Sequence, residues 1–289
     1  MTGNVFKVEE ISGPRLDAFD RDSTIIVIPF GILELHGPHL PYGTDLFETE
    51  AMTEKIIQTL LEKEPTVDIA LFPIIPLGVF GIENLSPSMF TTYGSFTIGV
   101  ETMQAIVIDM IANFAKFGFK HIVVASFHGA PEHCTAINQG ADEVAQTHSV
   151  SVLPVMSYLF FPLFFGGEYI EKFNDCLKTK LSEGEKEALR RFVHAEAVET
   201  SAMLNLKPKL VDDSYKTLKP VVFEYEKMFE EIRKLDNWQG YVGIPSEARA
   251  EIGQVFIDVV GKECASLILK WYKGDDLGGM RRYPEGLNI

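Results

Sequence analysis

The chain has 289 residues, of which 46% are hydrophobic and 23% are charged, so it can bury a substantial core. Its formal net charge of −15 argues against nucleic acid as a partner and against an anionic membrane surface, because both require a basic surface. No apolar run approaches the ~20 residues of a membrane-spanning helix, and residues 1–20 contain no signal-peptide core. The three cysteines include no Cys-x-x-Cys pair, which favours reduced thiols and a cytoplasmic location.

Apolar strands alternate with amphipathic helices through the first half of the chain, after a polar lead-in over residues 1–22. We predict strands at 24–30, 67–77, 121–126 and 150–156, and helices at 46–61, 99–117 and 132–147. This alternation favours an α/β fold with a mostly parallel sheet that is covered by helices on both faces. No linker or internal repeat is visible, so we expect a single domain over residues 1–289.

The second half is less regular. Residues 158–165 form an aromatic block that is typical of core, pocket wall or subunit interface, and we expect a neighbouring subunit to cover it or the block to line the pocket. We predict helical structure within 168–191, from 194 through 206 and over 246–272, a polar peripheral stretch at 211–237, and an irregular tail at 273–289. The loop at 78–95 is long enough to border a functional site.

Ligand-type side chains follow the ends of two predicted strands. Glu34, His36 and Asp45 come after the first strand, and His128 lies just past the third, beside Gly129. Glu34 and His36 are two residues apart, so on extended backbone both point to the same side. In open α/β sheets ligands bind at these strand ends, and carboxylates with imidazoles suit zinc, manganese or iron.

His194 and Glu199 come from a later predicted helix start. If that helix begins near Glu196, then Glu199 falls in its first turn, and Glu196 and Glu132 compete with it as a further ligand. The chemistry that fits is metal-assisted hydrolysis by two divalent ions that share Asp45, with His194 passing a proton to the leaving nitrogen. The remaining histidines are interpreted as core or solvated side chains.

Several segments resemble the creatininase (creatinine amidohydrolase) family. They are Glu34-x-His36-Gly-Pro-His-Leu-Pro-x-Gly-Thr-Asp45, His128-Gly129, His194-Ala-x-x-x-Glu199-Thr-Ser and Gly240-x-x-Gly243-x-Pro245 with the helix after it. The resemblance covers residues from about 23 to 270, and its first motif is long and specific.

The resemblance implies a three-layer α/β/α fold, hydrolysis of a C–N bond in a small-molecule amide, a homohexamer and two divalent metal ions, zinc or manganese with iron as a further option. Carried over residue by residue, Glu34, Asp45 and His128 would hold one metal, and His36 and Asp45 the other. Glu199 would complete the second site.

Departures from the family pattern concern the second metal and the substrate. Ala130 stands where creatininase has a glutamate that completes the second metal site, which is why Glu199 is the expected substitute. The tryptophans that wall the creatinine pocket have no counterpart, because Trp238 and Trp271 are the only two in the chain. These departures argue against creatinine as the substrate. Ser126-Phe127 and Pro131 also replace asparagines that flank His128 in the family pattern. These changes around His128 motivate an alternative, a catalytically inactive member that binds a small molecule or a partner.

Overall fold

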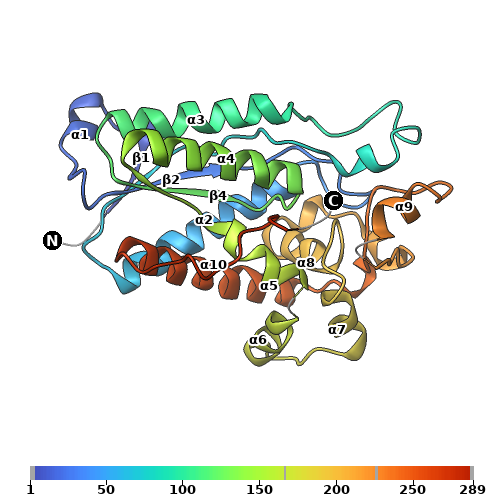
Figure 1. Ribbon diagram of the computed structural model, residues 1–289. Coiled ribbons are helices and arrows are strands. Elements are labelled where there is room, and N and C mark those ends of the chain that lie inside the picture. The colour runs from blue at the N-terminus through green and yellow to red at the C-terminus, as the bar shows by residue number, and fades with distance from the viewer. Residues whose placement is uncertain (1–3, 166, 225–226, 287–289) are drawn as a thin grey trace.

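The computed structural model describes residues 4–165, 167–224 and 227–286 (Figure 1). Five strands form one sheet in the order β1-β3-β2-β4-β5, and every pair of neighbours is parallel. The strands are β1 (Val5–Lys7), β2 (Ile25–Phe30), β3 (Ile69–Leu71), β4 (His121–Ser126) and β5 (Ser151–Pro154).

The two central strands determine where the candidate site lies. β2 and β4 pair along their whole length, from Ile25 opposite His121 to Phe30 opposite Ser126. Every residue of β2 is buried, because helices cover both faces of the sheet. The segments that leave β2 and β4 therefore start side by side at the carboxyl edge of the sheet.

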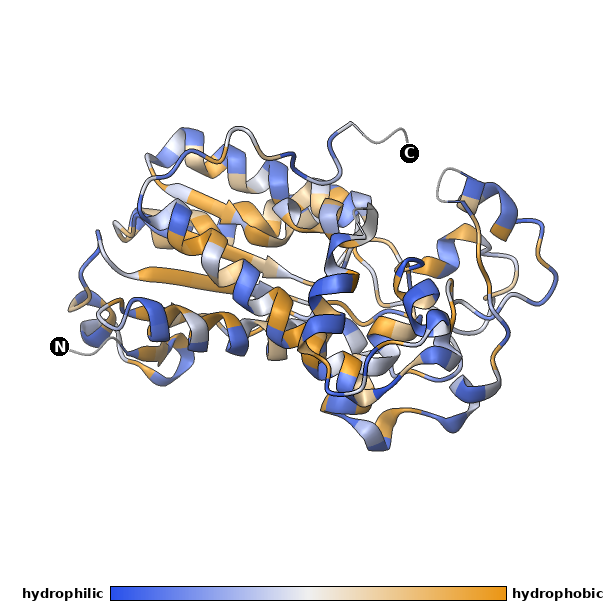
Figure 2. Cartoon of the chain, turned by 90° about the horizontal axis from the view of Figure 1, so that it is seen from below, coloured by the Kyte–Doolittle hydropathy of each residue, from blue (hydrophilic) through white to orange (hydrophobic). Residues whose placement is uncertain are grey.

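Helices form the outer layers of a three-layer α/β/α architecture. In Figure 1, α3 (Val100–Lys116) and α4 (Pro131–His148) lie on one side of the sheet, while α2 (Thr44–Lys63) and α10 (Ala250–Tyr272) lie on the other. The hydropathy colouring shows apolar strands in the middle and helices that are apolar on one side and polar on the other (Figure 2). The predicted fold class is confirmed.

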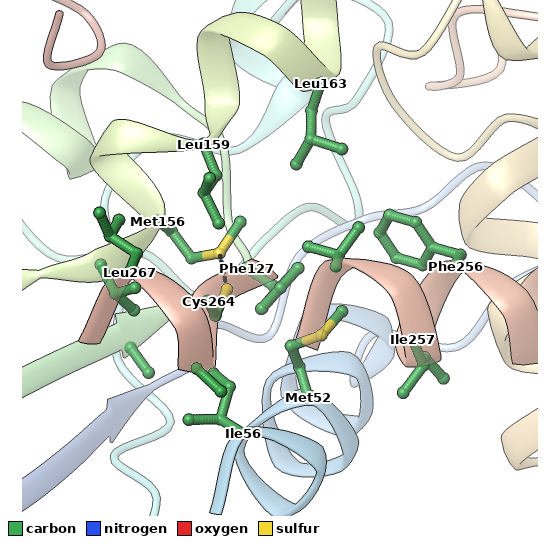
Figure 3. Close-up of a cluster of buried hydrophobic side chains, with 14 of the residues drawn as sticks. Met52, Ile56, Phe127, Met156, Leu159, Leu163, Phe256, Ile257, Cys264 and Leu267 are labelled. Atoms are coloured by element: carbon green, nitrogen blue, oxygen red, sulfur yellow. Dashed lines mark hydrogen bonds between the residues drawn. The ribbon is translucent and has the colours of Figure 1, made fainter. Parts of the chain in front are cut away.

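Each face of the sheet has its own apolar core. Figure 3 shows the core between α2 and α10, where Met52 and Ile56 pack with Cys264 and Leu267. Met156 belongs to the same cluster, with its Sδ 3.5 Å from Cys264 Sγ. The core on the other face contains the buried side chains of α3 and α4.

The remaining elements lie beyond the carboxyl edge of the sheet or at the periphery of the fold. The helices are α1 (Gly13–Asp17), α5 (Phe160–Phe165), α6 (Glu168–Cys176), α7 (Glu183–Leu189), α8 (Ala197–Leu206) and α9 (Met228–Ile232). Short 3₁₀ turns are η1 (Val8–Glu10), η2 (Ile82–Leu85), η3 (Val155–Tyr158), η4 (Pro208–Leu210), η5 (Asp213–Thr217) and η7 (Pro245–Glu247). None of the described helices combines the length and the apolar character needed to cross a lipid bilayer.

Two predicted segments near the sheet are wrong in detail. The lead-in at 1–22 is not merely polar, because it contributes the edge strand β1 and helix α1. β3 is much shorter than residues 67–77, because Pro73 and Pro76 have no N–H to donate to a ladder. Beyond the end of β3 the chain still runs alongside β2, because Ile75 N donates to Pro29 O at 3.0 Å.

Two predictions for the second half are refined by the structure. Part of the aromatic block belongs to the core, which was one of its expected roles, since Leu159, Phe160 and Leu163 are buried in the cluster that α10 shares. The stretch at 211–237 is not only peripheral, because Met228 and Ile232 of α9 are buried in a separate apolar cluster.

Candidate metal centre

All five predicted ligand residues meet at the carboxyl edge of the sheet. Glu34 and His36 lie in the segment after β2, Asp45 in the first turn of α2, His128 two residues after β4, and Glu199 in the first turn of α8. Each of the five is at most 7% exposed. Buried carboxylates are unfavourable without compensation, so a cation is expected among them.

Asp45 joins two ligand groups. Its Oδ2 lies 3.2 Å from His128 Nδ1, and its Oδ1 lies 3.3 Å from His36 Nε2. Glu34, Asp45 and His128 offer ligand atoms within 4.8 Å of one another, and so do His36, Asp45 and Glu199. One carboxylate therefore faces both groups, with one oxygen toward each.

The two ligand-type imidazoles are oriented by backbone carbonyls. His36 Nδ1 lies 3.0 Å from Glu34 O, and His128 Nε2 lies 2.9 Å from Val79 O. In the neutral ring, an N–H donated to each carbonyl leaves the other ring nitrogen with a lone pair toward the carboxylates. This is the arrangement in which histidines bind metal ions.

Buried atoms without hydrogen-bond partners test whether metal ions fit here. Glu34 Oε2, His36 Nε2 and Asp45 Oδ2 are all buried and make no hydrogen bond to the described residues. Native proteins rarely leave such atoms unsatisfied. Histidine nitrogens and carboxylate oxygens are the ligands of zinc and manganese, so the residues present fit two such ions.

The carboxylates of the candidate centre strongly shift the pKa values of its two ligand-type histidines. Burial alone would lower the pKa of His36, but Asp45, Glu199 and Glu34 outweigh it and raise that pKa to about 10. Burial would also lower the pKa of His128, but Glu34 and Asp45 raise that pKa well above its ordinary value. In the metal-free protein these imidazoles retain protons that a metal ion would have to displace.

The structure distinguishes the three candidates for the further ligand. Glu196 is the N-cap of α8, where its carboxylate accepts the N–H groups of Val198 at 2.8 Å and Glu199 at 3.2 Å. Glu132 is half-buried on α4 and belongs to none of the ligand groups among the described residues. Of these three candidates, Glu199 is the one that joins a ligand group, with a carboxylate oxygen 3.7 Å from His36 Nε2.

The backbone before α8 places both His194 and Glu199. Ala195 has a φ of 49°, an uncommon value for a residue with a side chain, and its N–H is donated to Glu199 Oε2. His194 pairs with Val242 through its backbone, and its Nε2 lies 2.8 Å from Leu35 O. Its Nδ1 thus faces the centre, 4.0 Å from a Glu34 oxygen.

Two buried residues beside the centre were not singled out from the sequence. Glu48 lies three residues after Asp45 on α2, and burial, with Glu199 and Asp45 nearby, raises its pKa well above the ordinary value. The i, i+3 spacing from Asp45 was the available signal. His133, interpreted as a core histidine, accepts the Val79 N–H at 3.3 Å, so it holds the same residue whose carbonyl orients His128.

A pocket opens over Glu34, Asp45, His128, His194 and Glu199, and its remaining lining comes from five parts of the chain. These are the loop of Phe80 to Leu85, the turn of Phe127 to Pro131, Phe192 with Val193, Met228 of α9, and Tyr283. Tyr283 belongs to the irregular tail, yet it is 1% exposed, and its hydroxyl donates to Gly129 O at 3.0 Å. Sequence analysis gave no signal for this contact, which joins residues 154 positions apart.

Residues 9–268 match the family model described as creatinine amidohydrolase. The chain belongs to the creatininase family. A curated relative is the 3-dehydro-scyllo-inosose hydrolase of Thermotoga maritima, which is 25% identical over 231 residues, 76% of this chain. The match spans 63% of that protein, so the chain covers less than two thirds of its length.

Solved creatininase structures share the fold. A manganese form is 19% identical with a TM-score of 0.65, and the match covers 93% of this chain and 99% of the other. A mutant creatininase of zinc–zinc type is 20% identical with a TM-score of 0.63, covering 92% and 98%. At these identities the likeness extends to the architecture and not to the substrate.

Proposed function

We propose that this creatininase-family protein is a metal-dependent amidohydrolase that cleaves a C–N bond in a cyclic amide, a formamide or a related small molecule. The observation that carries the proposal is Asp45, whose two oxygens face the Glu34–His128 group and the His36–Glu199 group. Two divalent ions at these groups would lower the pKa of water and polarise a carbonyl oxygen. Zinc or manganese, with iron as a further option, suits the ligand set.

His194 is the candidate proton carrier. Its Nε2 donates to Leu35 O, so its Nδ1 is free to accept a proton on the side of the pocket. Protonated there, it can donate to a leaving nitrogen above the carboxylates. A positioned imidazole contributes about 10²–10⁴-fold in such a role.

Metal content and activity test the proposal together. Protein purified without chelator and reconstituted with zinc or manganese is analysed for metal and screened against lactams, hydantoins and formamides. We expect Asp45→Ala to lose metal at both groups and all turnover, because it removes the shared carboxylate. Asp109→Ala, an exposed aspartate on α3, is the matched control and should keep both.

The screen should also include cyclic ketones, because a relative is named for an inosose. A ketone carbonyl is an electrophile that the same centre could activate. The alternative of an inactive binding protein is motivated by Phe127, Ala130 and Pro131, which replace family residues around His128. It predicts no turnover across the panel and little functional change in Asp45→Ala.

We also propose a homohexamer, on the family resemblance. Native mass spectrometry tests this directly, and a monomer at micromolar concentration would contradict it.

A further inference from the structure

The pocket over the candidate centre has a polar floor and an apolar wall. The floor is formed by the carboxylates and imidazoles already described. The wall consists of the side chains of Phe80, Ile82, Leu85, Phe127, Phe192, Val193 and Met228. When a substrate carbonyl reaches the floor, a substituent that stays inside the pocket lies against aliphatic and aromatic groups.

The wall offers almost nothing to a charged or hydrogen-bonding substituent. None of the described residues that line the pocket is a lysine, arginine, asparagine, glutamine, serine or threonine. Tyr283 also lines the pocket, and its hydroxyl donates to Gly129 O at 3.0 Å. An anionic substituent packed against this wall would lose its hydration without gaining a countercharge from the wall, which is strongly unfavourable.

The wall is held in place by packing behind it. Ile82, Leu85 and Met228 are 7%, 2% and 5% exposed, and they share one apolar cluster with Trp238. The Ile82 N–H also donates to Glu34 Oε1 at 2.8 Å, which fixes the wall relative to the centre. A preformed apolar surface favours ligands that match it, because little ordering is needed on binding.

We propose that the substrate carries an alkyl or aryl substituent beside the scissile carbonyl and no anionic group. This inference rests on the proposed function, since it assumes that the carbonyl reacts at the centre. It also separates this chain from a hydrolase of polyhydroxylated rings, because each hydroxyl group would need a hydrogen-bond partner that the side chains of the wall do not supply.

A ladder of hydroxamates, that is, a series of three probes that differ in one substituent, tests the inference through binding affinity alone. Hydroxamates chelate metal ions, so each probe is anchored at the centre while its substituent samples the wall. Isothermal titration calorimetry on the metal-loaded protein compares acetohydroxamate, phenylacetohydroxamate and the monohydroxamate of succinic acid. We expect the phenyl probe to bind at least about tenfold more tightly than acetohydroxamate, because it buries apolar area. The succinyl probe should bind more weakly than acetohydroxamate.

A gain of affinity for the succinyl probe, or none for the phenyl probe, would overturn the inference. Met228→Lys places a cation in the wall and should improve binding of the succinyl probe while weakening the phenyl probe. Met280→Lys makes the same change at a position that is 40% exposed and outside the pocket lining, so it should leave the ladder unchanged. The wild-type ladder stands as a test even if Met228→Lys folds poorly.

The two proposals can fail separately. If the ladder shows the apolar preference but no amide or formamide is hydrolysed, the proposed function fails and the character of the pocket stands. If matched hydantoins with benzyl and carboxymethyl substituents are hydrolysed equally well, the proposed function stands and the inference fails.

Discussion

At the residue scale, His36 and His128 place protons and metal ions in competition. The pKa of His36 is raised to about 10, and that of His128 is raised well above its ordinary value, so both imidazoles stay protonated near pH 7 without metal. We therefore predict that metal binding at pH 7 releases protons and that the affinity weakens as the pH falls. Calorimetry in buffers of different ionisation enthalpy measures the release. Metal binding that is independent of buffer and pH would contradict this.

His194 is expected to act on turnover and not on metal content. We predict that His194→Asn lowers kcat by about 10²–10⁴-fold, because it removes the group that carries the proton. His194 also forms a possible ligand group with Glu34 and His36, but the two groups that Asp45 joins do not include it. Metal stoichiometry should therefore stay at the wild-type value. His148→Asn, at the end of α4, is the control and should change neither quantity. Loss of metal in His194→Asn would reassign the residue as a ligand.

The sequence predicted which residues meet at the candidate centre better than it predicted their surroundings. Glu34, His36 and Asp45 stand out because three ligand types follow one strand, and this is visible locally. Glu196 and Glu199 could not be separated by spacing, because the choice depends on which carboxylate caps α8. Tyr283 was missed because the residues next to it in the sequence give no indication of its contact with Gly129.

At the element scale, α8 and α10 approach so closely that a side chain is excluded between them. A Cβ built on Gly253 of α10 would lie 2.0 Å from Ser201 O of α8. We predict that Gly253→Ala lowers the free energy of unfolding by about 1–3 kcal/mol or more, because the helices must separate. Since α8 also carries Glu199, metal affinity should fall in the same variant. Denaturant titration and metal analysis measure the two effects.

A matched control for this substitution is available in α1. A Cβ on Gly13 meets no atom within 4 Å, so Gly13→Ala should leave both stability and metal affinity near their wild-type values. If Gly253→Ala were equally harmless, the close approach of the two helices would be wrong.

The predictability of the elements follows their length and their pattern. The long helices α2, α3, α4 and α10 show a clear apolar face over several turns, and they were predicted close to their observed bounds. β1 has three residues, too few for an alternation to be recognised. Met228 and Ile232 are buried because they form a cluster with Ile82 and Trp238. No local sequence pattern indicates this contact between distant parts of the chain.

At the scale of the whole molecule, the candidate centre joins four elements that also share one apolar core. Its ligands come from the ends of β2 and β4 and from the first turns of α2 and α8. Glu34, Asp45 and Glu199 lie near one another, and each is at most 7% exposed. Without a cation, the burial of three neighbouring carboxylates opposes folding. Metal binding should therefore stabilise the entire fold and not only a loop.

We predict that removal of metal lowers the unfolding temperature, because an ion that binds only the folded state adds about 2.7 kcal/mol at a concentration one hundred times its Kd. For a chain of this size, each kcal/mol corresponds to roughly 2–4 °C. Calorimetry before and after chelation, followed by return of zinc or manganese, measures the shift. Asp45→Ala should unfold at the same temperature with and without chelator, because the carboxylate shared by both groups is gone. A wild-type protein that is equally indifferent to chelation would mean that the five buried side chains bind no metal and meet for another reason.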